Sequence, residues 1–189
     1  QRLVVSYVLD LPFGAGKKFL GSSSGAIGKL VSGWGINGIM TYQRGFPLHL
    51  VTAANLTNSF GGGSRPNFDA TTCPNGAALD GSAQSQLNKW FETSCFTQPP
   101  AFTFGNLART LADVRADGIA NWDFALFKST TFGSTDNPLA LQFRAEFFNL
   151  FNTPQFAFPG QVHGTGQFGV VSAQLNNPRL VQFALKFTF

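Results

Sequence analysis

Charged side chains and long apolar runs are both scarce in this sequence. Only 12% of the 189 residues are charged, about half the share found in typical soluble domains. No run of about 18 apolar residues occurs, so no segment qualifies as a transmembrane helix. An initiator methionine and a basic-then-apolar signal segment are also missing from the start. We therefore expect the chain to be part of a longer protein whose targeting signal lies upstream.

Basic residues are in excess but are not concentrated. The formal net charge is +4 and the pI is about 9.4, yet the only adjacent basic pair is Lys17-Lys18. Nucleic-acid-binding domains usually gather their basic residues into a patch or stripe. Nucleic acid is therefore not an expected partner.

Phenylalanine is the residue that is present in excess. The chain has 22 phenylalanines but only two tyrosines and one methionine, together with 21 glycines and 10 prolines. Aromatic residues favour strands, and glycine and proline favour turns. The composition therefore indicates an all-β fold with a large apolar surface.

Five segments alternate apolar and polar residues with the period of two that is typical of strands: residues 1–11, 34–51, 121–132, 139–152 and 179–189. Each is long enough for a tilted strand to cross a bilayer. The segment 34–51 aligns apolar residues as far as Phe46, Leu48 and Leu50. Eight residues on the apolar faces are expected to contact lipid: Trp122, Phe124, Leu141, Phe143, Phe147, Phe183, Leu185 and Phe187.

The opposite faces of these segments carry charges in mid-strand. Gln142 and four charged residues are expected to face the interior of a barrel: Asp123, Arg144, Glu146 and Lys186. Lipid would oppose such charges by several kcal/mol, whereas a water-filled or plug-filled interior accepts them. Arg144 and Glu146 share a face and could pair across strands with Asp123 or Lys186.

The connections between the segments alternate between long and short. The longest, residues 52–120, is rich in Gly, Asn, Ser and Pro, and the shortest is a tight turn at 133–137. Outer-membrane barrels combine long external loops with short periplasmic turns in this way. The predicted fold is therefore all-β: an antiparallel transmembrane β-barrel fragment of about five strands with one long extracellular loop. A soluble, carbohydrate-binding β-sandwich would also alternate and remains an alternative.

The two cysteines, Cys73 and Cys95, both lie in the long connection. An isolated pair in a polar loop is typical of a disulfide in an oxidising compartment, with two free thiols as the alternative. The pair offers too few ligands for a metal, and His49 and His163 are distant in sequence.

Motifs that resemble active sites are better explained by structure. The run 164–169 satisfies G-x-G-x-x-G but lies in a loop that leads to the last segment, so a turn is expected rather than a cofactor site. Asp123 and Glu146 are interpreted as a charge ladder rather than as a glycosidase pair. We predict no catalytic, cofactor-binding or metal-binding residues, and no enzyme activity. Seven loop aromatics could bind a ligand, but most are expected to pack within the loop: Phe60, Phe68, Trp90, Phe91, Phe96, Phe102 and Phe104.

A series of stretches resembles a known family in order and spacing. They are LVVSYVLDLPFGAGKKFL, SGWGINGIMTYQRGFPLHLVT, RPNFD, WFETSCF, FTFGNLAR, NWDFALFKSTTF, LQFRAEFFNLFNTPQFAFPG and LVQFALKFTF. Together they cover nearly the whole chain, which resembles the C-terminal part of TonB-dependent outer-membrane receptors of the Oar-like branch. Members of this branch often carry an N-terminal carboxypeptidase-regulatory-like domain.

The resemblance implies a barrel of about 22 strands around an N-terminal plug. Such receptors use energy from the TonB complex to import siderophores, vitamins or saccharides, and some Oar-like members are associated with export. The implied partners are outer-membrane lipid, upstream strands and a plug of the same chain, the barrel-assembly machinery, and the TonB complex through the missing N-terminal part. The implied location is the bacterial outer membrane. A barrel that serves as a secretion or adhesion platform is the alternative within the membrane class.

The last segment also carries a prediction from the resemblance, because the closing strand of such barrels is read by the assembly machinery. Here that signal would comprise Phe183, Leu185, Phe187 and Phe189. Main-chain pairing to the strand edge would give affinity, and the alternating side chains would give specificity.

Deletion of Phe189 from the parent protein should leave it unassembled in the periplasm, measured as loss of heat-modifiable, folded barrel. If Phe189 is only an interfacial anchor, folded barrel will persist at near-normal levels.

Overall fold

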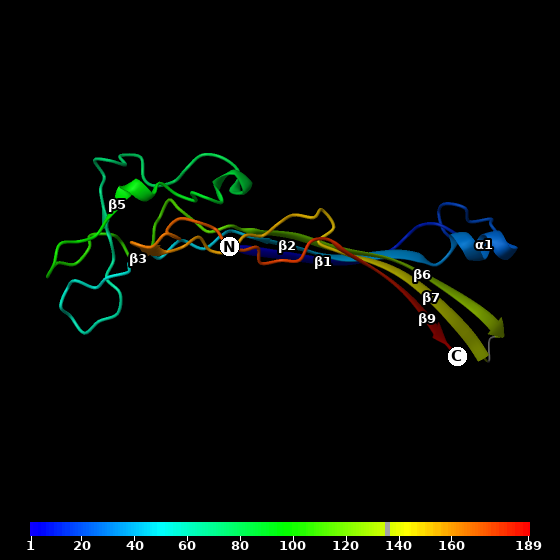
Figure 1. Ribbon diagram of the computed structural model, residues 1–189. Helices are drawn as coiled ribbons and strands as arrows, with labels where there is room; N and C mark the ends of the chain where they lie inside the picture. The colour runs from blue at the N-terminus through cyan, green and yellow to red at the C-terminus, as the bar shows by residue number, and fades with distance from the viewer. Residues whose placement is uncertain (135–136) are drawn as a thin grey trace. The chain divides into compact units, whose positions relative to one another are not determined.

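The computed structural model describes residues 1–134 and 137–189 (Figure 1). The chain divides into two compact units. The first, which we call the strand unit, comprises residues 1–43, 120–153 and 177–189. The second, which we call the loop unit, comprises residues 44–119 and 154–176. Each unit is described by itself.

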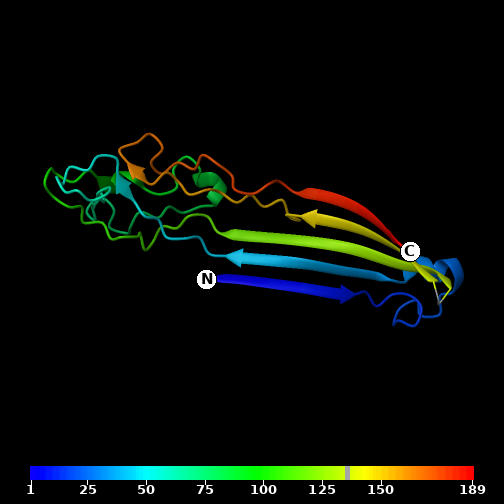
Figure 2. The same cartoon turned by 90° about the horizontal axis from the view of Figure 1, so that it is seen from below.

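The strand unit is built on one antiparallel sheet of five long strands. They are β1 (Arg2–Asp10), β2 (Trp34–Gln43), β6 (Ile119–Ser134), β7 (Asn137–Phe148) and β9 (Leu180–Thr188). They lie side by side in the order β1-β2-β6-β7-β9 (Figure 2). Among the described residues, the outer edges of β1 and β9 have no neighbouring strand. The sheet is therefore open at both edges.

All five predicted strands are present, and the bounds of four of them agree with the prediction to within a few residues. Strands β6 and β7 are longer than expected towards the connection between them, because Ser134 pairs with Asn137. The tight turn predicted at 133–137 falls partly outside the described residues, which exclude 135–136. Mainly β structure and an antiparallel sheet are confirmed.

The predicted strand 34–51 is wrong in its second half. Strand β2 ends at Gln43, and the chain then enters the loop unit. Pro47 has no backbone N–H to donate to a sheet ladder. Leu48 and Leu50 do not continue the apolar face but are 0% and 1% exposed within the core of the loop unit. The backbone of Leu48 instead hydrogen-bonds to that of Leu111 and Val114.

The connection between β1 and β2 contains a short helix that the alternation pattern did not predict. Helix α1 spans Gly25–Val31. It lies at the end of the sheet where β6 and β7 are joined (Figures 1 and 2).

No helix among the described residues is both long enough and apolar enough to cross a membrane.

The loop unit contains only short elements. Strand β3 (Val51–Thr52) pairs in parallel with β8 (Val162–His163), and β4 (Asn67–Phe68) pairs with β5 (Phe96–Thr97). Two 3-10 helices, η1 (Ala83–Gln86) and η2 (Thr93–Cys95), complete it. The unit nevertheless has its own core, whose largest members are Leu48, Leu50, Trp90, Phe91, Phe96, Leu107 and Leu111. The predicted long loop is thus a compact structure that also recruits residues 154–176.

A disulfide between Cys73 and Cys95 lies in this core. The backbone of Asp69 hydrogen-bonds to both cysteines, because its N–H donates to the Cys95 carbonyl and its carbonyl accepts from the Cys73 N–H.

Two carboxyl groups of the loop unit have lowered pKa values. Hydrogen bonds from Thr72 and Thr71 lower the pKa of the Asp69 carboxyl to about 2. Hydrogen bonds from Lys89 and Ser94 likewise lower the pKa of Glu92, which caps η2, to about 2.

Replacing both Cys73 and Cys95 with serine should destabilise the loop unit by about 3 kcal/mol, because the bond closes a loop with a sequence separation of 22. The strands should still assemble, since the core of the loop unit is separate from the sheet. Limited proteolysis of the membrane-inserted protein would report faster cleavage in residues 44–119. Mass spectrometry that finds both thiols free in the wild-type protein from membranes would contradict the premise.

Candidate functional site

The strand register places the predicted apolar residues on one surface, which we call the apolar face. Phe143 of β7 pairs with Leu185 of β9, and Phe147 pairs with Phe124 of β6. Paired residues in antiparallel strands point to the same side. The face comprises Trp122, Phe124, Leu126, Phe132, Leu139, Leu141, Phe143, Ala145, Phe147, Val181, Phe183, Leu185 and Phe187.

Aromatic residues mark both ends of the apolar face. At one end the Trp122 indole donates a hydrogen bond to the Tyr42 hydroxyl and its ring contacts Phe151 at 5.1 Å. At the other end lie Trp34 and Phe132. Trp122 and Phe132 are ten residues apart on β6, which is roughly 34 Å along a strand. At the usual barrel tilt this corresponds to roughly 26 Å of height, close to the apolar band of outer-membrane barrels.

The predicted charged residues share the opposite surface, which we call the polar face. Arg144 lies 3.6 Å from Glu146 on the same strand, measured from Nη1 to Oε1. Lys186 is beside Gln142, not beside a carboxylate. The Asp123 carboxylate accepts a hydrogen bond from the Asn149 N–H at 3.0 Å. The expectation that Asp123 or Lys186 pairs with Arg144 or Glu146 across strands is therefore wrong, because the register offsets these charges.

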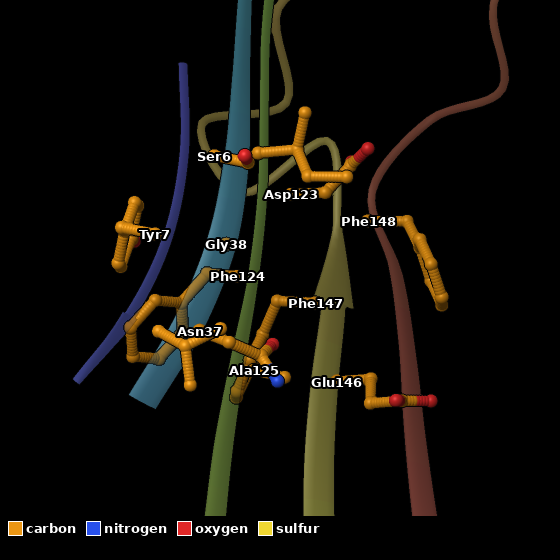
Figure 3. A pocket seen from close by; sticks show the side chains of 12 residues that line it. Ser6, Tyr7, Asn37, Gly38, Asp123, Phe124, Ala125, Glu146, Phe147 and Phe148 are labelled. Atoms are coloured by element: carbon orange, nitrogen blue, oxygen red, sulfur yellow. The ribbon is translucent and has the colours of Figure 1, made fainter. Parts of the chain in front are cut away.

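The polar face is hollowed where β1, β2, β6 and β7 lie next to each other (Figure 3). The hollow has a volume of about 390 Å³. Three successive residues of each strand line it: Ser6, Tyr7 and Val8 of β1, Asn37, Gly38 and Ile39 of β2, Asp123, Phe124 and Ala125 of β6, and Glu146, Phe147 and Phe148 of β7. The polar-face members of this set are Ser6, Val8, Asn37, Ile39, Asp123, Ala125, Glu146 and Phe148. Two carboxylates beside hydroxyl, amide and apolar groups could hold a polar solute or a packed protein segment.

Each face has exceptions that alternation did not single out. Lys128 pairs with Phe143 and so belongs to the apolar face. Its Nζ donates to the carbonyls of Lys29 and Ser32, at 2.7 and 2.8 Å. On the polar face the Phe127 ring covers Gly35, where a side chain at Gly35 would collide with it. The sequence did offer a sign of this exception, because Lys128 is the one charged residue among the alternate positions of segment 121–132 that include Trp122 and Phe124.

Other candidate residues lie in structural roles. The run 164–169 forms a turn, where Phe168 N–H donates to Thr165. His49 Nδ1 is hydrogen-bonded to the Arg109 carbonyl at 2.6 Å, and His163 Nε2 is hydrogen-bonded to the Phe96 carbonyl at 3.1 Å. Within residues 1–134 and 137–189, no group of three or more His, Cys, Asp or Glu side chains could hold a metal ion.

The loop aromatics divide into two sets. Four pack in or against the core of the loop unit: Phe68, Trp90, Phe91 and Phe96. Three are exposed, by 112%, 76% and 76%: Phe60, Phe102 and Phe104. The exposed aromatics lie on two loops, one around Phe60 and one around Phe102 and Phe104. These loops are neighbours, because the Phe102 N–H donates to the Leu56 carbonyl.

The predicted assembly-signal residues lie on the last strand. Phe183, Leu185 and Phe187 are 68%, 69% and 55% exposed on the apolar face, and Phe189 is 95% exposed. The outer edge of β9 leaves its backbone groups available to another strand.

Comparison with known families agrees with this two-faced sheet. The family model described as outer membrane beta barrel domain matches residues 1–182. The search of curated proteins found no match, and neither did the search of solved structures. The protein is therefore located in the bacterial outer membrane, and the chain belongs to the outer membrane beta barrel domain family.

Proposed function

We propose that this chain forms part of the barrel of a TonB-dependent transporter that takes up a scarce nutrient, such as a siderophore, a vitamin or a saccharide. The observation that carries the proposal is the pairing of an apolar face with a charged, hollowed face on one sheet. A barrel wall of this kind encloses a polar interior, which transport requires. The choice of TonB-dependent uptake rests on the resemblance of nearly the whole chain to that family.

The apolar face is the lipid-facing side in this proposal. Strand edges cannot remain unpaired in hydrocarbon, so β1 and β9 would each pair with a further strand of the parent barrel. A plug domain would fill the interior and contact the polar face. The TonB complex would act through that plug, so the residues that couple transport to energy lie outside this chain.

The two long connections, 44–118 and 149–179, leave the same end of the sheet. Barrels of this class place long loops outside the cell. The loop unit would therefore face the medium, where a disulfide is stable. Its exposed aromatic residues would be among the first groups that an arriving nutrient meets.

A secretion or adhesion platform is the second candidate, because it needs the same lipid-facing and interior surfaces. The charged hollow does not separate the two functions.

Phe143→Lys should prevent or weaken barrel folding, because lysine at the middle of a lipid-facing strand is unfavourable by about 2–4 kcal/mol. The substitution Gln182→Lys is the control and should be nearly neutral, because Gln182 lies on the polar face directly opposite Glu146. Both variants would be compared by heat-modifiable migration and urea unfolding of the full-length protein in outer-membrane vesicles. Equal effects of the two lysines would contradict the assignment of faces.

Uptake can be tested in the native host. Disrupting the gene for this protein should abolish uptake of one among labelled ferric siderophore, cobalamin and maltooligosaccharide. Disrupting the TonB complex should abolish uptake of the same compound. Restoring the gene should restore uptake. Normal uptake of all three compounds, together with a loss of secreted protein or of surface attachment, would favour the second candidate.

A further inference from the structure

The connection between β1 and β2, residues 11–33, has a composition that differs from that of every other connection in the sheet. It contains three lysines, Lys17, Lys18 and Lys29, and no aspartate or glutamate. Five of its large apolar side chains are 40–68% exposed: Phe13, Phe19, Leu20, Ile27 and Leu30. Exposed apolar groups and unopposed positive charge occur here within one short segment.

The segment is a tied structure and not an extended loop. Ala15 N–H donates to the Ser32 Oγ at 2.9 Å, which joins the first half of the segment to the end of α1. Gly14 N–H donates to the Phe19 carbonyl at 2.9 Å, and the rings of Phe13 and Phe19 lie 5.7 Å apart. The first half of the segment is therefore held against the end of α1.

Three residues of the apolar face hold the segment. Lys128 Nζ donates to two carbonyls at the end of α1. Trp34 donates its indole N–H to the Leu30 carbonyl at 2.9 Å. The Lys29 ammonium lies 5.2 Å from the centre of the Phe132 ring. The segment is thus continuous with the face that carries the phenylalanines, next to its terminal aromatic residues.

We propose that residues 11–33 are a membrane-surface anchor that binds the anionic headgroups of phospholipids in the leaflet at this end of the strands. The apolar side chains would enter the boundary between headgroups and acyl chains, and Lys17, Lys18 and Lys29 would contact phosphates. This inference rests on the assignment of the apolar face to lipid. It adds a specific lipid ligand to a segment that uptake itself does not use.

Charge selects lipid over a second copy of the chain as the occupant. A second copy would bring the same three lysines to the contact, and the segment offers no carboxylate to meet them. An anionic leaflet supplies opposite charge at high density and attracts basic residues near its surface. Long lysine stems can also lie along apolar surface while their ammonium groups reach the phosphates.

The test places an environment-sensitive fluorophore on the full-length protein through Ala26→Cys, an exposed position on α1. A second protein carries the label at Ala112→Cys, an exposed position of the loop unit. Both are reconstituted in phosphatidylethanolamine vesicles with brominated acyl chains, with or without phosphatidylglycerol. Bromine should quench the label at position 26 several-fold more than the label at 112, and most strongly with phosphatidylglycerol present.

Two sets of substitutions separate the contributions. K17Q/K18Q/K29Q should remove the part of the quenching that depends on phosphatidylglycerol. I27Q/L30Q should reduce quenching in both lipids several-fold, whereas L175Q, at a leucine that is equally exposed (68%) in the loop unit, should not.

Equal quenching at positions 26 and 112 would contradict the proposed anchor. Quenching at position 26 that is the same with and without phosphatidylglycerol would contradict it as well. A third protein labelled through Leu185→Cys, an exposed position on the apolar face, serves as the standard in the same vesicles. If the label at 185 is quenched and the label at 26 is not, the anchor alone fails. If neither is quenched, the lipid-facing assignment fails as well.

Discussion

The requirement that every backbone N–H and C=O be hydrogen-bonded in hydrocarbon is the constraint on which the rest of this structure depends. Within a sheet the ladder satisfies these groups, and strands β6, β7 and β9 are long enough for the ladder to persist across a bilayer. The same constraint makes the open edges of β1 and β9 untenable in lipid. In the proposed barrel each edge would pair with a further strand, and the sheet would be one arc of a closed wall.

Given a hydrogen-bonded sheet, side-chain alternation decides what each surface contacts. This part of the fold was readable from the sequence, because a shift of one residue would move the whole apolar set of a strand to the opposite surface. Alternation could not show where a strand stops. Phe46, Leu48 and Leu50 continue the period of β2, yet the two leucines are buried in the loop unit. Gly45 and Pro47 were the local signs that the ladder ends.

The details of the polar face were less predictable. The presence of Asp123, Arg144, Glu146 and Lys186 on one surface follows from parity alone. Which of them pair depends on the register between strands, and register is set by turns and by packing. The observed register puts Lys186 beside Gln142 and leaves Glu146 with Arg144 of its own strand. The compact fold of residues 44–119 could not be predicted from the sequence either, because its core is formed by residues that are far apart in sequence.

Lys128 shows how one residue can break the alternation without breaking the fold. A lone ammonium among phenylalanines would be strongly unfavourable in lipid. Here it donates to carbonyls at the C-terminal end of α1, where a helix leaves unpaired acceptors and a partial negative charge. The lysine and the helix end therefore satisfy each other. Neither group could be interpreted from its own stretch of sequence, since the contact spans 99 and 96 residues. The exception to the alternation pattern thus identifies the point at which the connection between β1 and β2 is fastened to the apolar face.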